Sequence, residues 1–230
     1  MNGKNIAVII VAAGSGSRFG GDVPKQFCLL EGRPVLMHSI ERFARMMPEA
    51  EITVVLSADR VEFWNELSNQ YGFTVGHKIA IGGATRWESV KNALETVSDN
   101  IQTVLIHDGA RPLVSNTTVS DLCEAVKAGA EGALPVLPMV DSLRETGTGG
   151  ESTAVDRSRY VAVQTPQAFP ARLLREAYRL PYSPLMTDDA SVMEFAGHTD
   201  IRLVSGNAAT LKITRSEDMD IAALYLRRGY

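Results

Sequence analysis

The chain has 230 residues, of which 45% are hydrophobic and 22% charged, and its formal net charge at pH 7 is −4. The length is enough for one large α/β domain with a buried core, and the composition is that of an ordinary globular protein. A mildly acidic protein is not suited to coat nucleic acid or anionic lipid, so we expect neither nucleic acid nor a membrane among its partners. An anionic substrate would have to meet a local cluster of Lys and Arg side chains.

The cysteine content and the N-terminal segment favour a soluble, cytoplasmic protein. Cys28 and Cys123 are the only cysteines in the sequence and lie far apart, which is typical of a reducing compartment. The apolar run at residues 6–13 is too short to span a membrane, and glycines rather than a signal-peptidase site follow it.

Strands and helices alternate in the first half of the chain. Residues 6–11 are an apolar run rich in β-branched residues, which is typical of a buried parallel strand. Further strands are expected at residues 52–56, 74–81 and 103–106, and helices from Pro34 onwards and at residues 59–71, 85–97 and 115–128. This alternation predicts a Rossmann-like α/β domain with a mainly parallel, twisted sheet and helices on both faces. The loops that follow the strands should border one crevice, and they start at Ala12, Ser57, Gly82 and His107.

The alternation stops after a strand at residues 133–137. Residues 141–160 are polar, contain three glycines near their middle and have little to offer a core. We expect two extended strands joined by a turn, which project from the domain and lie against a partner subunit. The chain is therefore interpreted as one domain over residues 1–230, with residues 141–160 as a projecting dimerisation arm.

The C-terminal third returns to helices. Helices are expected at residues 170–180 and 187–196, and a short strand at residues 211–213 precedes the last helix. Thr214 and Glu217 have the three-residue spacing of a capping box, so we expect the last helix to begin at Thr214.

A loop rich in glycine and serine follows the first strand. Gly14 and Gly16 leave backbone N–H groups free to turn towards an anion, because no Cβ stands in the way. Phe19 stands where a dinucleotide fingerprint needs glycine, and Asp22 stands where a phosphate-binding P-loop needs lysine. The alternative is a flexible connection without a ligand.

The segment Pro24-Lys25-Gln26 strengthens the anion-binding interpretation. Arg18 and Lys25 place two cations on the glycine loop, which suits a nucleoside triphosphate and the charge that builds on its α-phosphate during transfer. The alternative is a pair of solvated surface charges.

A second group of polar residues follows the strand at residues 103–106. Asp108 stands at the carboxyl end of a buried strand and could hold Mg²⁺, which prefers carboxylate and phosphate oxygens. Arg111 could hold an acceptor phosphate. The alternative is an internal salt bridge that shapes the loop. We interpret His107 as structural, because no second His or Cys accompanies it at the spacing of metal ligands.

Together these motifs resemble the 2-C-methyl-D-erythritol 4-phosphate cytidylyltransferases. The motifs that carry the resemblance are Ala12-Ala13-Gly14 with Gly16 and Arg18, Pro24-Lys25-Gln26, His107-Asp108 with Ala110-Arg111-Pro112, Asp156-Arg157, Gln164-Thr165-Pro166-Gln167, Thr187-Asp188-Asp189-Ala190-Ser191 and Lys212. The resemblance implies that CTP and 2-C-methyl-D-erythritol 4-phosphate react, with Mg²⁺, to give the CDP-linked methylerythritol and pyrophosphate. It also implies a homodimer in which the arm clasps the partner.

The resemblance implies a role for each matching position. Arg18 and Lys25 match residues that stabilise the pentacoordinate phosphorus, whereas Arg157 and Lys212 match residues that position the acceptor phosphate. Nucleotide contacts are implied for Ala12, Ala13, Gly14, Gly16, Gly83 and Ser89. Acceptor or metal contacts are implied for Asp108, Arg111, Ser142, Thr165 and Thr187. Ala84 stands where an acidic residue is common in the family, which leaves the cytosine contact to backbone groups.

Other activities remain open at this stage. A ribitol-5-phosphate cytidylyltransferase would share the glycine loop and the Pro-Lys-Gln segment. A sugar-1-phosphate nucleotidyltransferase usually carries an added module, and a non-catalytic nucleotide-binding regulator would not need cations on both the nucleotide side and the acceptor side. Whether Arg157 acts within its own subunit or across a dimer is also open.

Overall fold

The computed structural model describes residues 3–14 and 23–230. Its main sheet has eight strands, of which seven follow the order β10-β7-β11-β6-β1-β4-β5 and the eighth, β12, pairs with β7 outside this order. The parallel part contains β1 (Ile6–Val11), β4 (Glu51–Leu56), β5 (Lys78–Ile81) and β6 (Thr103–Asp108). The other part contains β7 (Gly132–Pro138), β10 (Val161–Val163), β11 (Gln167–Pro170) and β12 (Ile201–Ser205). This arrangement confirms the predicted α/β fold with a mainly parallel sheet.

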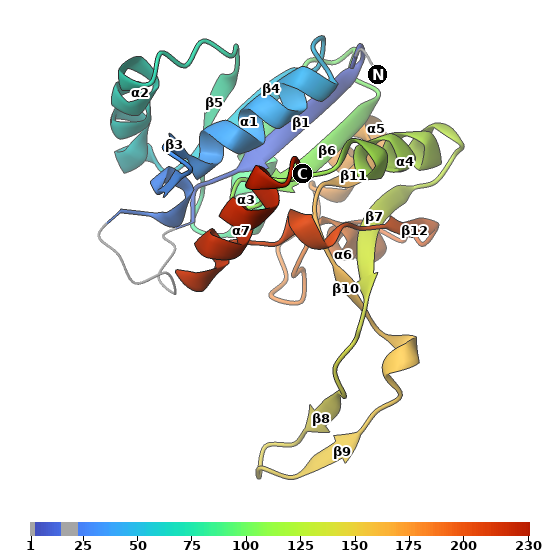
Figure 1. Ribbon diagram of the computed structural model, residues 1–230. Helices are drawn as coiled ribbons and strands as arrows, with labels where there is room; N and C mark the ends of the chain where they lie inside the picture. Colours follow the sequence, from blue (N-terminus) through green and yellow to red (C-terminus); the bar gives the residue numbers. More distant parts are fainter. Residues whose placement is uncertain (1–2, 15–22) are drawn as a thin grey trace.

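Helices cover both faces of the sheet (Figure 1). They are α1 (Val35–Met46), α2 (Val61–Gln70), α3 (Arg86–Leu94), α4 (Asn116–Lys127), α5 (Ala171–Ala177), α6 (Asp189–Phe195) and α7 (Glu217–Arg227). Side chains of β1 alternate between the two faces, as the pleat of a strand requires. Ala7 and Ile9 lie in the core under α3, α5 and α6, whereas Val8 and Ile10 lie in the core under α1, α2 and α4. A third, smaller core is built around Leu30, Leu113 and Ile213 beneath α7.

The order in which the chain adds parallel strands to the sheet reverses beside β1. From β1 the chain adds β4 and β5 on one side, and then returns to place β6 on the other side. In open α/β sheets the crevice at such a switch point, outside the carboxyl ends of the strands, is the usual place for a ligand. The ends of β1 and β6, at Ala12 and Asp108, meet at this point.

Several predicted elements have other bounds in the structure or are absent from it. The strand expected at residues 74–81 is shorter in the structure, where only β5 (Lys78–Ile81) pairs with β4 and residues 74–77 form no strand. Residues 211–213 form no strand, and they follow the 3-10 helix η4 (Ala208–Thr210) as extended chain. The last helix begins at Glu217, because the Asp218 carboxylate accepts the backbone N–H groups of Thr214 and Arg215 and holds them outside the helix.

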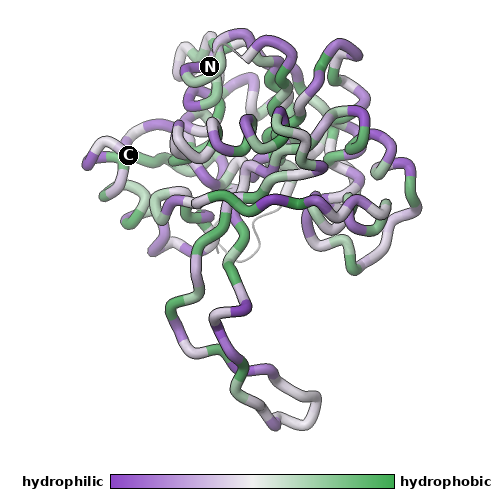
Figure 2. Tube along the Cα trace, turned by 90° about the vertical axis from the view of Figure 1, so that its right-hand side faces the viewer, coloured by the Kyte–Doolittle hydropathy of each residue, from purple (hydrophilic) through white to green (hydrophobic). Residues whose placement is uncertain are grey.

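The arm projects from the end of β7 and β10. Its strands β8 (Arg144–Thr146) and β9 (Ser152–Ala154) form a two-stranded antiparallel sheet whose residues are all exposed. Figures 1 and 2 show the arm extending away from the body of the molecule in both views. In the returning half of the arm, Arg157 in the 3-10 helix η3 (Arg157–Arg159) donates a hydrogen bond to the carbonyl of Val140 and links the two halves.

The remaining elements are short. They are the 3-10 helices η1 (Lys25–Phe27) and η2 (Ala58–Arg60) and the hairpin strands β2 (Leu29–Leu30) and β3 (Arg33–Pro34). Within residues 3–14 and 23–230, every helix is too short or too polar to cross a lipid bilayer.

His107 is a structural residue near the end of β6. Its ring is fully buried, and Nε2 lies 2.9 Å from the carbonyl oxygen of Arg111 while Nδ1 lies 3.1 Å from Oγ1 of Thr165. A carbonyl can only accept, so Nε2 carries the proton and Nδ1 accepts from the Thr165 hydroxyl. That hydroxyl oxygen accepts the backbone N–H of Asp108 at 3.0 Å. A neutral imidazole therefore fixes the end of β6, where Asp108 stands.

The neutral state of His107 should make folding sensitive to mild acid. Burial lowers the pKa of His107 to about 4, whereas the unfolded chain takes up the proton near pH 6.5. Between these values the unfolded state binds more protons, so the free energy of unfolding should fall as the pH drops, by about 3 kcal/mol across the window. Urea unfolding at pH 7 and pH 5 measures the slope. His107→Gln should flatten it, and an unchanged slope in this variant would contradict the assignment.

Candidate active site

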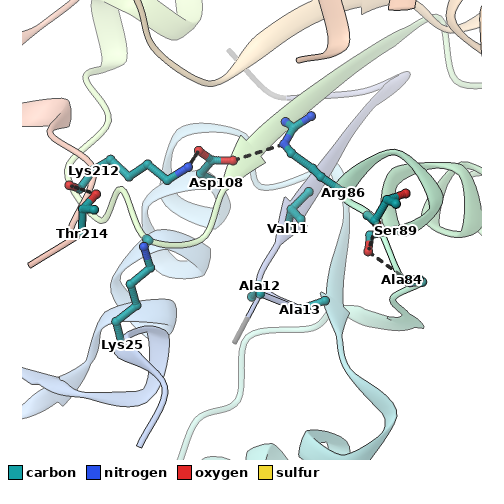
Figure 3. Close-up of a pocket in the computed structure, with 14 residues that line it drawn as sticks. Val11, Ala12, Ala13, Lys25, Ala84, Arg86, Ser89, Asp108, Lys212 and Thr214 are labelled. Carbon is teal, nitrogen blue, oxygen red and sulfur yellow. Dashed lines mark hydrogen bonds and ion pairs between the residues drawn. The ribbon is translucent and has the colours of Figure 1, made fainter. Parts of the chain in front are cut away.

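A cavity of about 560 Å³ opens at the carboxyl ends of β1 and β6. Its lining comes from three loops and one C-terminal segment. The lining residues are Val11 to Gly14, Lys25, Gly83 to Arg86, Ser89, Asp108, Ala110, Lys212 and Thr214. Figure 3 shows Asp108 between Lys212 and Arg86, with Lys25 extending towards them from another side. Of the four loops predicted to border the crevice, the one at Ser57 lies outside this lining.

Asp108 is surrounded by three cationic side chains. Its Oδ2 lies 2.8 Å from Nζ of Lys212 and 3.8 Å from Nε of Arg111, and its Oδ1 lies 3.7 Å from Nε of Arg86. Burial alone would raise the pKa of the Asp108 carboxyl, but the charges of Arg86, Lys212 and Arg111 outweigh it and hold the pKa well below its usual range. Asp108 therefore stays ionised at any pH at which the protein works.

The loop after β6 also places Lys212. The backbone N–H of Ile213 donates to the carbonyl of Ala110 at 2.9 Å, and Nη1 of Arg111 donates to the carbonyl of Thr210 at 2.9 Å. These bonds hold the chain on both sides of Lys212 against the loop that follows Asp108. A residue that the sequence placed more than 100 positions from Asp108 thus becomes its nearest charged partner.

Arg86 is a cavity residue that the sequence analysis missed. It is the first residue of α3, and its terminal nitrogens Nη1 and Nη2 bind the two carboxylate oxygens of Asp189 at 2.9 and 2.6 Å. One signal was present, because a cation in the first turn of a helix lies at the positive end of the helix dipole and is unfavourable there without a partner. Asp189, the partner, is fully buried at the start of α6.

The described part of the glycine loop, which ends at Gly14, is hydrogen-bonded to the segment around Lys25. The side-chain amide of Gln26 is buried and donates to the carbonyls of Ala12 at 2.7 Å and Gly14 at 3.1 Å. Gln26 was part of the quoted motif but had received no role. Its bonds hold the segment with Lys25 against the loop of Ala12 and Gly14, and Lys25 lines the same cavity as these two residues. Gly16 and Arg18, two predicted site residues, lie outside the described residues.

The loop before α3 forms the opposite wall. The Gly83 N–H donates to Oγ of Ser89 at 3.1 Å, and Glu88 accepts the N–H groups of Ala84 and Thr85 in a capping box. A Cβ on Gly82 would lie 2.5 Å from the Cβ of Ala13, so the two loops can approach this closely only with glycine there. The predicted nucleotide contacts Gly83 and Ser89 therefore face Ala12, Ala13 and Gly14 across one cavity.

The residues predicted to bind the acceptor are more widely separated than the predicted nucleotide contacts. Arg111 and Thr165 lie beneath the cavity, where the bonds described above engage the Arg111 guanidinium and the Thr165 hydroxyl. Ser142 and Arg157 are exposed on the arm, and Thr187 is exposed just before α6. None of these five residues is among the described residues that line the cavity. Asp108 and Lys212 are the predicted acceptor-side residues that do line it.

The arrangement suits an anionic ligand. Arg86, Arg111 and Lys212 carry three positive charges against the two carboxylates of Asp108 and Asp189, and Lys25 adds a further positive charge at the wall. The backbone of the glycine loop and Lys25 both belong to the lining of this cavity. A polyphosphate could lie along this wall, with its charge compensated inside a partly enclosed site where electrostatic interactions are stronger than in water.

Comparisons with known proteins agree on one family. The model of the family IspD, 2-C-methyl-D-erythritol 4-phosphate cytidylyltransferase, matches residues 6–228. A relative of that name from Porphyromonas gingivalis is 47% identical over 219 residues, which cover 95% of this chain and 96% of the relative.

Solved structures extend the agreement to the fold. The 2-C-methyl-D-erythritol 4-phosphate cytidylyltransferase of Thermus thermophilus superposes with a TM-score of 0.75 at 32% identity, over 96% of this chain and 98% of that one. The 4-diphosphocytidyl-2C-methyl-D-erythritol synthase of Anaerococcus prevotii has the same fold, with a TM-score of 0.81 at 24% identity over 97% and 96% of the two chains. The match along nearly the whole sequence shows that this chain belongs to the 2-C-methyl-D-erythritol 4-phosphate cytidylyltransferase family.

Proposed function

We propose that the protein joins CTP and 2-C-methyl-D-erythritol 4-phosphate to give 4-diphosphocytidyl-2-C-methyl-D-erythritol and pyrophosphate. The observation that carries the proposal is the cationic cluster around Asp108 at the switch point of the sheet, in a chain of this family. The cluster supplies positive charge on the side of Asp108 and Lys212, and Lys25 supplies it at the wall of the glycine loop. A nucleotidyl transfer between two phosphate compounds needs charge compensation for both.

The nucleotide is assigned to the wall formed by the glycine loop and the loop before α3. The backbone at Ala12 to Gly14 and the proposed contacts Gly16, Arg18 and Lys25 take the triphosphate. The short polar edge at Gly83 and Ser89 takes the base, and its small size suits a pyrimidine. In this assignment Lys25 and Arg18 act on the α-phosphate, where negative charge increases as five oxygens come to surround the phosphorus.

The acceptor is assigned to the side of Asp108 and Lys212. An oxygen of its phosphate attacks the α-phosphorus in line, a new P–O bond forms, and the bond to the bridging oxygen of the β-phosphate breaks to release pyrophosphate. The acceptor phosphate is already ionised near neutral pH, so the step needs no strong base, and positioning and electrostatics supply the acceleration. Lys212 exchanges its contact with Asp108 for the incoming phosphate. Arg111, Thr165 and Thr187 are proposed to shape or contact the acceptor site.

Magnesium fits the site only together with the nucleotide. Among the described residues no cluster of three or more His, Cys, Asp or Glu could hold a metal ion, and Asp108 is the one acidic side chain of the cavity lining. One carboxylate plus substrate phosphates is the usual way in which proteins hold Mg²⁺. We therefore propose Asp108 as the protein ligand of Mg²⁺ carried by the triphosphate, and the ion would neutralise part of the phosphate charge.

A homodimer would complete the acceptor side. Arg157 and Ser142 lie on an exposed arm that extends away from its own subunit (Figure 1), so in a dimer the arm of one subunit could bring both to the cavity of the other. A guanidinium grips phosphate through a fixed fork of donors, which suits Arg157 for the acceptor phosphate. We also propose the cytoplasm as the location, which agrees with the free thiols of Cys28 and Cys123.

Pyrophosphate release tests the proposed reaction directly. The purified protein should release pyrophosphate from CTP and 2-C-methyl-D-erythritol 4-phosphate, and far more slowly when ATP, GTP or UTP replaces CTP or ribitol 5-phosphate replaces the acceptor. Lys25→Met should lower kcat by about 10²–10³, the usual loss for a group that acts on transition-state charge. Lys127→Met, which removes an exposed lysine on α4, serves as the control and should leave kcat unchanged. Equal turnover with ATP, or faster turnover with ribitol 5-phosphate, would overturn the assignment.

Subunit mixing tests whether Arg157 acts across a dimer. Arg157→Ala and Lys25→Met should each be nearly inactive alone, but a mixed dimer would contain one intact site and one doubly damaged site. Activity should then return to about a quarter of wild type under random exchange, because half of the dimers are mixed. Arg144→Ala, which removes another arm arginine, should be active without mixing. No recovery after demonstrated exchange would place Arg157 in the site of its own subunit or outside the site.

A further inference from the structure

A fully buried carboxylate lies directly behind the cavity wall. Asp189 is 0% exposed and binds both terminal nitrogens of Arg86, and the hydroxyl of Tyr178 donates to its Oδ1 at 2.7 Å. Apolar side chains of similar volume often stabilise a core as well as a buried ion pair does, or better. Stability alone therefore gives no reason for two charges at this place.

The geometry of the pair fixes how Arg86 faces the cavity. Because Nη1 and Nη2 are both bound by Asp189, the guanidinium plane is held by two parallel bonds, and its Nε edge remains towards Asp108 at 3.7 Å. Arg86 thus touches the oxygen of Asp108 that Lys212 does not, since Lys212 binds Oδ2. The two cations hold the carboxylate from opposite sides (Figure 3).

Asp189 itself is held by its surroundings. Gln167 on β11 donates to the carboxylate of Asp188 at 2.8 Å and accepts the N–H of Ala190 at 3.1 Å, so the backbone is fixed on both sides of Asp189. The ring of Tyr178 stacks on Trp87 of α3 at 5.8 Å between centroids. Burial, together with the negative charge of Asp189, raises the pKa of Tyr178 well above its usual range, so its hydroxyl remains a donor.

We propose that Asp189 and Tyr178 are positioning residues for the nucleotidyl transfer. They act through Arg86 to hold Asp108 in a position from which the Lys212 side chain can move to the acceptor phosphate. This inference rests on the proposed function and extends it by two residues that do not line the cavity. Without Asp189, the nearest carboxylate for Arg86 is Asp108. Arg86 would turn to Asp108 and compete with Lys212, which would shift both groups away from the acceptor.

Asp189→Asn separates this role from a merely structural one. The substitution keeps the shape of the side chain and leaves one more uncompensated positive charge beside the cavity, so CTP binding should not weaken. We expect kcat to fall by up to about 100-fold, as small misplacements of reacting groups cause, while KM for CTP stays equal or falls. Tyr178→Phe should lower kcat less, and it keeps the ring that stacks on Trp87, so it carries the test if Asp189→Asn does not fold.

A destabilised control and a double variant complete the experiment. Leu174→Ala removes a fully buried side chain on α5 and should lower the thermal midpoint while leaving kcat per folded molecule unchanged. If Asp189 acts through Arg86, the Arg86→Gln/Asp189→Asn double variant should lose no more than Arg86→Gln alone. Wild-type kcat in both Asp189→Asn and Tyr178→Phe, or losses that simply add in the double variant, would overturn the inference. Failure of the wild-type protein to release pyrophosphate from CTP and the methylerythritol phosphate would instead overturn the proposed function.

Discussion

One carboxylate organises the charged residues of the cavity. Asp108 ends a buried strand and draws Lys212 and Arg86 to its two oxygens, with Arg111 beneath. Without that negative charge, these cations would repel one another inside a partly enclosed site, where Coulomb interactions are only weakly screened. In the proposed reaction the substrate phosphates need the same cations, and the carboxylate would keep these cations in place until the anions arrive. The arrangement is one of preorganisation, in which the protein contributes fixed charge more than chemical groups that give or take protons.

The fold holds Asp108 through contacts that themselves carry no charge. The neutral ring of His107 and the hydroxyl of Thr165 fix the backbone at the end of β6, and the carbonyl of Ala110 fixes the chain beside Lys212. These bonds connect three distant parts of the sequence. Two of these parts, around Thr165 and around Lys212, belong to antiparallel or irregular segments added to the parallel sheet. The additions to the Rossmann-like core, rather than the core itself, complete the side of the cavity that is proposed for the acceptor.

The sequence predicted the parallel half of the fold because long apolar runs and helical periodicity are local signals. The strands β10, β11 and β12 were missed, since strands of three to five residues are too short to show a clear hydrophobic pattern. Of the site, the motifs identified Lys25 and Asp108, whereas the pairing of Arg86 with Asp189 joins residues 103 positions apart, a distance that local patterns cannot bridge. For Lys212 the residues alone indicated nothing, and only the family resemblance assigned its role.

The central claim is that Asp108 is an ionised carboxylate held by three cations, and its titration tests this most directly. Carbon-13 NMR of the side-chain carboxyls, with Asp108→Asn to assign the signal, reports protonation of each aspartate as the pH falls. The account predicts that the Asp108 signal stays that of a carboxylate at pH values where exposed aspartates, with a pKa of about 3.9, have already titrated. Titration of Asp108 together with the exposed aspartates would show that the cations do not surround it in solution, and would contradict the account.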